Sequence, residues 1–113
     1  MQVDNDMIAT GQTDYFNPNF RYTLEAHIPY LLSLASTTSV TVNPHDTTVY
    51  NQDFFGYLLS LNILPCYHWI TMRVNGMFSP TEFNSDINSI FIPSTKELES
   101  LRQSWNAIGI INT

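Results

Sequence analysis

The chain has 113 residues, of which 43% are hydrophobic and 13% aromatic, so it can form one domain with a core and is not wholly disordered. Only 12% of the residues are charged, about half of the roughly 25% typical of soluble domains, and the net charge is −6. The four basic residues are too few to neutralise a phosphate backbone or an anionic membrane surface, so we expect no nucleic-acid partner and no membrane partner.

The cysteine content and the N-terminal sequence argue against a secreted protein held together by disulfides. Cys66 is the only cysteine, which excludes an intrachain disulfide, and its aromatic neighbours favour a small buried side chain. The first residues lack the basic and apolar regions of a signal peptide. No apolar run exceeds four residues, so we predict no membrane-spanning helix and expect synthesis in the cytoplasm.

Residues 1–38 are predicted to form an arm that docks on neighbouring proteins. Residues 1–19 contain turn-forming residues without a sustained period, and Tyr15 and Phe16 are the apolar anchors of this segment. From Phe20 to Ile28 apolar and polar residues alternate, which is typical of a half-buried strand. Pro29 and the leucines after it could begin a short helix, so we expect an extended segment followed by a helical turn.

Residues 39–93 predict a strand, two helices and a second strand. The β-branched run 38–42 favours the first strand, and Asp46 or Thr47 is the expected N-cap of a helix over 48–61. Apolar residues of this helix recur every three or four positions, and a second apolar stripe suggests that another segment or chain covers it.

The second half of this module is predicted from shorter signals. An apolar run over 66–74 predicts a second, shorter helix, and the Asn-Gly pair at 75–76 suits its left-handed end. The run 89–92 predicts the second strand. Residues 94–113 then begin with a capping box, Ser94 and Glu97, and continue as a helix with an apolar tail.

The order of elements and three short motifs in residues 39–93 resemble a LysM module. The matching motifs are Asp46-Thr47 after the first strand, Asn75-Gly76 after the second helix and Ile92-Pro93 at the end of the second strand. The run 67–76 and the Ser79-Pro80 pair after it are similar to LysM-like domains of baseplate and tail proteins of contractile-tailed bacteriophages. The resemblance implies an α+β fold: a βααβ module over 39–93, an extended N-terminal arm over 1–38 and a C-terminal helix over 94–113.

The resemblance and the composition favour a non-catalytic structural adaptor, located in the virion, in the tail or baseplate, and bound to other baseplate proteins. Aromatic residues on a weakly charged chain are typical of interface cores, although they could also form an ordinary core with scattered surface rings. The candidate interface residues are Tyr15, Phe16, Phe20, Phe54, Tyr57, Phe78, Trp105, Ile110 and Ile111.

No catalytic residue, cofactor or metal is predicted. The histidines, His27, His45 and His68, are far apart in sequence, and no pair has the spacing of metal ligands on one helix. Cys66 and His68, two residues apart on a helix, would point in directions about 200° apart. His68 is instead expected to be half-buried and hydrogen-bonded to the backbone.

Two alternative functions stay open. The resemblance to LysM implies that a shallow groove could bind peptidoglycan or chitin, with the candidate residues Pro44, His45, Asp46, Thr47, Asn75, Gly76 and Met77. His45 replaces the glycine that this family commonly has before the Asp-Thr pair. The third possibility is a small assembly chaperone, which would be absent from finished particles.

Overall fold

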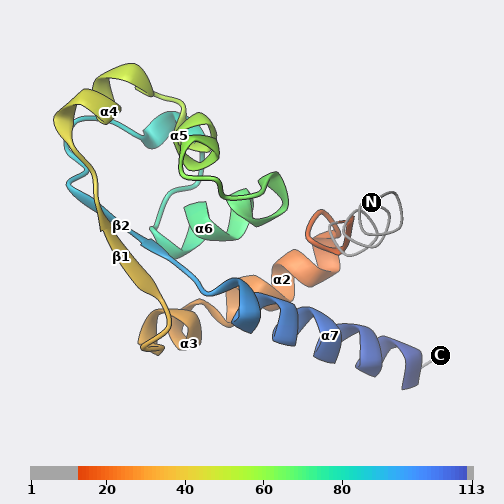
Figure 1. Cartoon of the computed structure of the whole chain (residues 1–113). Coiled ribbons are helices and arrows are strands. Elements are labelled where there is room, and N and C mark those ends of the chain that lie inside the picture. Colours follow the sequence, from red (N-terminus) through yellow and green to blue (C-terminus); the bar gives the residue numbers. More distant parts are fainter. Residues whose placement is uncertain (1–12, 112–113) are drawn as a thin grey trace, which may run out of the picture.

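The computed structural model describes residues 13–111, with side chains as far as residue 107. The fold combines helices with a sheet of two strands, and this α+β architecture confirms the predicted fold class (Figure 1). In chain order the elements are α2 (Pro18–Ala26), α3 (Ile28–Ser33), β1 (Thr38–Thr41), α4 (Pro44–Val49), α5 (Phe54–Ser60), η1 (Pro65–Tyr67), α6 (His68–Val74), η2 (Pro80–Glu82), β2 (Ser89–Ile92) and α7 (Thr95–Ile111).

Both predicted strands are confirmed, and they pair with each other. β1 and β2 are antiparallel, with Thr38 opposite Ile92 and Thr41 opposite Ser89. Successive side chains of a strand point to opposite faces, so Val40 and Ile90 face the interior while Ser39 and Thr41 face outward. One face of the sheet is therefore part of the core and the other is exposed.

The N-terminal segment is helical from Pro18 to Ser33, so the strand predicted for Phe20–Ile28 is wrong. The side chain of Asn17 caps α2 by accepting a hydrogen bond from the Asn19 N–H, and a proline occupies the first turn. The alternating pattern also places Phe20 and Leu24 four residues apart, which is the spacing of one helix face, and both are buried. Residues 1–12 of the predicted arm lie outside the described residues.

The helix predicted over 48–61 is two helices, α4 and α5, so three α-helices rather than two separate the strands, together with the 3-10 helices η1 and η2. Gln52 adopts a left-handed conformation with φ of 62°, which an α-helix cannot continue through. Asp53 then caps α5 by accepting a hydrogen bond from the Gly56 N–H at 3.0 Å. The helix is therefore interrupted at these two residues, although the apolar residues recur at helical spacing across them.

The N-cap of α4 is Asn43, not Asp46 or Thr47. Its side chain accepts a hydrogen bond from the Asp46 N–H at 2.9 Å, and Pro44 follows at the first helical position. Thr47 is buried inside α4, and its hydroxyl donates to the Pro44 carbonyl. The sequence Asn-Pro is a start signal in itself, because the amide side chain caps and the proline presets φ.

The predicted left-handed end of α6 is confirmed. Gly76 has φ of 79°, its N–H donates to the Arg73 carbonyl, and the Met77 N–H donates to the Met72 carbonyl. These two bonds form a Schellman motif, which satisfies the last carbonyls of the helix. A glycine suits this position because a side chain on a left-handed residue is strained.

Two clusters of buried residues form the core, and α6 contributes residues to both. Figure 1 shows α6 between α5 and α2. The helical cluster joins α2, α3, α6 and α7 through Tyr15, Phe20, Leu24, Leu31, Cys66, Ile70, Val74 and Leu98. The sheet cluster joins β2 and the residue after β1 to α5 and α6 through Val42, Phe54, Tyr57, Leu58, Met72, Met77, Phe83 and Ile90. Trp69 packs against both clusters, and α6 is buried on most of its circumference.

Candidate interaction surface

Four of the nine predicted interface residues are buried in the chain's own core, which corrects the prediction for them. Tyr15 and Phe20 pack edge to face, with ring centroids 5.3 Å apart, in the helical cluster. Phe54 and Tyr57 pack in the sheet cluster. These aromatic residues pack inside the fold, so some of the aromatic residues of this chain belong to an ordinary hydrophobic core.

The other predicted interface residues have different positions. Phe16 is 55% exposed and Phe78 is 78% exposed. Trp105 is half-buried on α7, where its ring lies 5.1 Å from that of Phe20. The side chains of Ile110 and Ile111 lie outside the described residues.

Phe16 and Phe78 each lie against a guanidinium group, and Trp69 and Arg73, one turn apart on α6, connect these two contacts into a row. At one end, the Arg21 guanidinium lies 5.4 Å from the Phe16 ring and 5.0 Å from the Trp69 ring. Its Nε also donates a hydrogen bond to the Tyr15 carbonyl at 2.8 Å, which fixes the side chain across the gap between α2 and α6. Burial lowers the pKa of Arg21 from its ordinary value.

The second half of the row is held by Arg73, one turn after Trp69 on α6. Its guanidinium lies 4.2 Å from the Phe78 ring. The same group donates to both carboxylate oxygens of Glu25, at 2.7 and 2.8 Å, and to the Met77 carbonyl at 2.8 Å. The hydrogen bond to Glu25 raises the pKa of Arg73 and lowers that of Glu25.

We call Phe16, Arg21, Trp69, Arg73 and Phe78 the aromatic–arginine strip. It uses two of the four basic residues of the chain, and both are positioned by hydrogen bonds before any partner binds. Aromatic and arginine side chains are enriched at the centres of protein interfaces, and a fixed side chain loses less entropy on binding. The strip is therefore the best candidate for a functional surface.

Sequence reasoning found Phe16 and Phe78 but missed the three residues between them. The spacing of Trp69 and Arg73, four residues apart on a helix, could have indicated that they share a face. The contact of Arg21 with Trp69 crosses from α2 to α6, and no local pattern indicates it.

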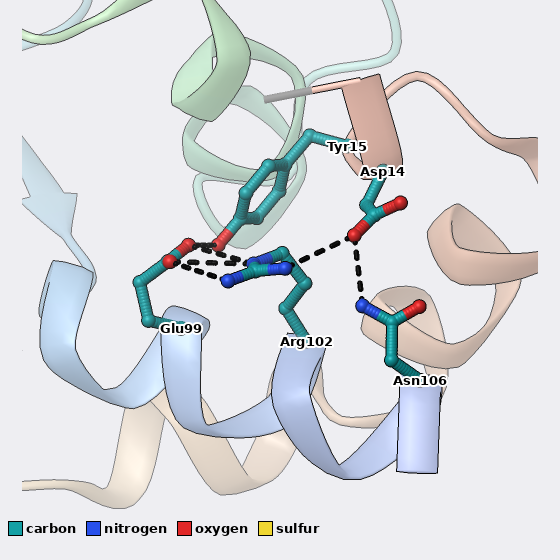
Figure 2. A network of polar contacts seen from close by, with 5 residues as sticks. All are labelled: Asp14, Tyr15, Glu99, Arg102 and Asn106. Atoms are coloured by element: carbon teal, nitrogen blue, oxygen red, sulfur yellow. Dashed lines mark hydrogen bonds and ion pairs between the residues drawn. The ribbon is translucent and has the colours of Figure 1, made fainter. Parts of the chain in front are cut away.

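A polar network joins the segment before α2 to α7 (Figure 2). Tyr15 donates its hydroxyl hydrogen bond to Glu99, and burial together with this carboxylate raises the Tyr15 pKa. The Arg102 guanidinium bonds to Glu99 at 3.1 Å and to Asp14 at 3.1 Å, and Asp14 also accepts from Asn106 at 2.9 Å. Each member is already paired with another, so the network fastens the two segments together.

Cys66 and His68 are both buried, as predicted for the cysteine, but His68 is more buried than expected. The Nε2 atom of His68 lies 2.8 Å from the Ile63 carbonyl, which confirms the expected backbone hydrogen bond. Burial raises the pKa of the Cys66 thiol to about 11 and lowers the pKa of His68. Both side chains therefore favour their neutral forms in the folded chain.

His68 predicts a loss of stability in mild acid. The unfolded chain takes up a proton on His68 near its ordinary pKa of 6.5, whereas the folded chain does so only at lower pH. The free energy of unfolding should therefore fall as the pH drops below about 6.5. Urea denaturation from about pH 7.5 to about pH 5.5 measures this slope. His68→Gln should flatten it, because the variant has no imidazole at this buried position. A slope that H68Q leaves unchanged would contradict the assignment.

The residues of the predicted glycan groove are divided in the structure. Asn75 and Met77 line a hollow of about 270 Å³ with residues 86–90, but none of the four residues Pro44 to Thr47 lines it. The amide of Asn75 donates to the Phe91 carbonyl at 2.8 Å and accepts from the Phe91 N–H at 2.7 Å. A second hollow, of about 310 Å³, lies between the start of η1 and the junction of β2 with α7.

Within residues 13–111 no group of three or more His, Cys, Asp or Glu side chains could hold a metal ion. No helix in this described part is both long and apolar enough to cross a membrane. Comparison with protein-family models, with curated proteins and with solved structures gave no match.

Proposed function

We propose that this protein is a non-catalytic structural adaptor that binds neighbouring subunits, and that its place is the tail or baseplate of a contractile-tailed bacteriophage. The tail or baseplate assignment rests on the sequence resemblance of residues 39–93 alone. The adaptor role rests on the surface of the molecule.

The aromatic–arginine strip is the observation that carries the adaptor role. Phe16 and Phe78 present their rings to solvent at its ends, so a partner can bury them. Arg21 and Arg73 are held in place by the Tyr15 carbonyl and by Glu25. A partner would bury the rings and meet guanidinium groups whose orientation is already fixed.

Loss of the two exposed rings tests the proposal. In cells that assemble the particle, a tagged chain should co-sediment with purified tails or baseplates, and Phe16→Ala with Phe78→Ala should reduce its incorporation by about tenfold or more. Cross-linking mass spectrometry on the particles should place the strip beside a neighbouring protein.

Tyr22→Ala is the matched control, because Tyr22 is 80% exposed on α2 and is not part of the strip. It should leave incorporation unchanged. Absence of the chain from finished particles would contradict the proposal and favour an assembly chaperone. Equal incorporation of the wild-type chain and the F16A/F78A variant would show that the strip is not the contact.

Glycan binding is the second candidate, favoured by the hollow beside Asn75 and Met77. Retention on insoluble peptidoglycan tests it with the full chain. Asn88 is exposed and lines the hollow, so Asn88→Lys should abolish retention without disturbing the core. Retention of the wild-type chain that N88K removes would support this candidate over the adaptor.

A further inference from the structure

The two outer edges of the sheet differ in whether their backbone N–H and carbonyl groups already have hydrogen-bond partners. Antiparallel strands alternate between residues that bond to the partner strand and residues whose backbone groups point away from it. The bonds of Phe91 to the Asn75 side chain show that Phe91 points away from β1, so Ser39, opposite it, points away from β2. Thr41 lies two residues further on and points the same way.

The outer edge of β2 is blocked at Phe91. The Asn75 side-chain amide occupies the position of a neighbouring strand there, since it accepts a hydrogen bond from the Phe91 N–H and donates one to the Phe91 carbonyl. Asn75 is fixed in turn by its place at the end of α6 and by a bond from its amide to the Thr71 carbonyl at 2.7 Å. A further strand therefore cannot pair with β2 at this position.

The outer edge of β1 is open in the described part of the chain. The backbone N–H and carbonyl groups of Ser39 and Thr41 have no partner among residues 13–111. β1 carries no charge, proline or bulge, which are common devices that prevent an edge from pairing. Just outside it, the Thr37 N–H already donates to Leu34, and the Asn43 carbonyl already accepts from Asp46.

We propose that this edge pairs with the β1 edge of a second copy of the chain, antiparallel and with the dyad at Val40. This register places Ser39 opposite Thr41 of the partner copy and Thr41 opposite its Ser39. All four open backbone groups of each strand are then satisfied, and no other symmetric register pairs both residues of both strands. The product is a four-stranded sheet in the order β2, β1, β1 and β2.

Two further features favour a second copy as the occupant. In this register Ser39 lies opposite Thr41 and Val40 lies opposite its own copy, and these neutral side chains meet without charge repulsion. Figure 1 shows α3 at one end of β1 and α4 at the other, so the dyad sets the α3 end of each copy beside the α4 end of its partner. Leu32 and Val49, at these two ends, are both exposed.

Asn75 determines how far this pairing extends. Asn75 blocks the β2 edge at Phe91 and leaves Ser89 as its one other outward residue, so among the described residues only β1 offers two successive outward residues for pairing, and a dyad between two β1 edges uses both. The assembly is therefore a closed dimer and not a fibre. This inference deepens the proposed adaptor role, since a dimer presents two aromatic–arginine strips to its neighbours.

Charge substitutions on the outward face test both the dimer and its register. Ser39→Lys with Thr41→Lys sets like charges opposite each other across the dyad, and should weaken dimerisation of the full chain by about tenfold or more. Ser39→Lys with Thr41→Glu sets lysine opposite glutamate and should restore it. Sedimentation equilibrium over a wide concentration range should show the wild-type mass rise from 12.9 kDa toward twice that value.

A second variant tests whether S39K/T41K weakens the dimer only because the variant chain misfolds. Ser39→Pro removes only an N–H that points away from β2, so it should keep the wild-type circular dichroism and still weaken the dimer. A wild-type chain that stays monomeric at all concentrations would overturn the inference, as would a dimer that S39K/T41K and S39P both leave intact.

The two proposals fail in different ways. F16A/F78A should leave the dimer intact, whereas S39K/T41K should leave each monomer with its strip. A monomeric wild-type chain that still enters particles through the strip would overturn the dimer alone. A dimer that S39K/T41K disrupts, but that never enters particles, would contradict the adaptor role alone.

Discussion

A fragment that contains only residues 38–93 is expected not to fold. It retains the predicted module but lacks α2, α3 and α7, which cover one side of α6. Ile70 and Val74 would lose Phe20, Leu24, Leu31 and Leu98 as buried neighbours. Burial of a large apolar side chain contributes about 1.5–3 kcal/mol, so losing several of them approaches the whole stability of a domain, roughly 5–15 kcal/mol. Far-UV circular dichroism and urea denaturation, with the full chain as reference, measure the effect.

The same experiment decides between two descriptions of the segments on either side of residues 38–93. If they are docking arms, as the sequence suggested, the fragment should unfold cooperatively with the midpoint of the full chain. If they complete the core, as their buried residues indicate, the fragment should show little helix and should aggregate. A fragment that melts like the full chain would contradict the second description.

Phe83→Ala is expected to have the largest effect of any single substitution in the sheet cluster. The Phe83 ring is fully buried, stacks on Tyr57 with a centroid distance of 5.0 Å and lies 5.4 Å from the Phe54 ring. Its loss removes the centre of this aromatic group and leaves a cavity, at a cost of about 3–5 kcal/mol in the free energy of unfolding. The urea midpoint at constant slope measures this cost.

Phe78→Ala is the matched control, because it removes the same side chain five residues away at an exposed position. It loses the contact with the Arg73 guanidinium, which is worth about 0.5–1 kcal/mol at such a site. A cost for F83A no larger than that for F78A would contradict the assignment of Phe83 to the core.

The sequence predicted the elements whose signals are local. Both strands were found because β-branched and aromatic residues lie between turn signals, at Asn43-Pro44 for the first and Pro93 for the second. The end of α6 was found because Asn75-Gly76 suits one backbone geometry. α7 was found because three apolar residues recur at helical spacing and Ser94 precedes them.

The secondary-structure predictions were wrong where the apolar pattern fits both a strand and a helix, or where the conformation of a single residue ends a helix. The run after Phe20 fits both a strand and a helix face, and the cap at Asn17 together with packing against α6 and α7 selects the helix. The left-handed residue at Gln52 divides the helix predicted over 48–61, and a glutamine gives little indication of that conformation.

The candidate site was predictable only at its ends. Phe16 and Phe78 stand out as rings in polar surroundings, but their partners Arg21 and Arg73 act across α2, α6 and the loop after α6. Burial of Tyr15, Phe20, Phe54 and Tyr57 depends on which helices meet, and composition alone cannot tell a core ring from an interface ring.

The position of Trp69 gives the protein an internal optical reporter. Its indole packs against both clusters and lies 5.0 Å from the Arg21 guanidinium, whereas Trp105, the other tryptophan, packs against Phe20. With Trp105 replaced by phenylalanine, all tryptophan fluorescence would come from Trp69, where the two clusters meet. A red shift of that emission would then reveal water entering between the two halves, whether denaturant or a binding partner separates them.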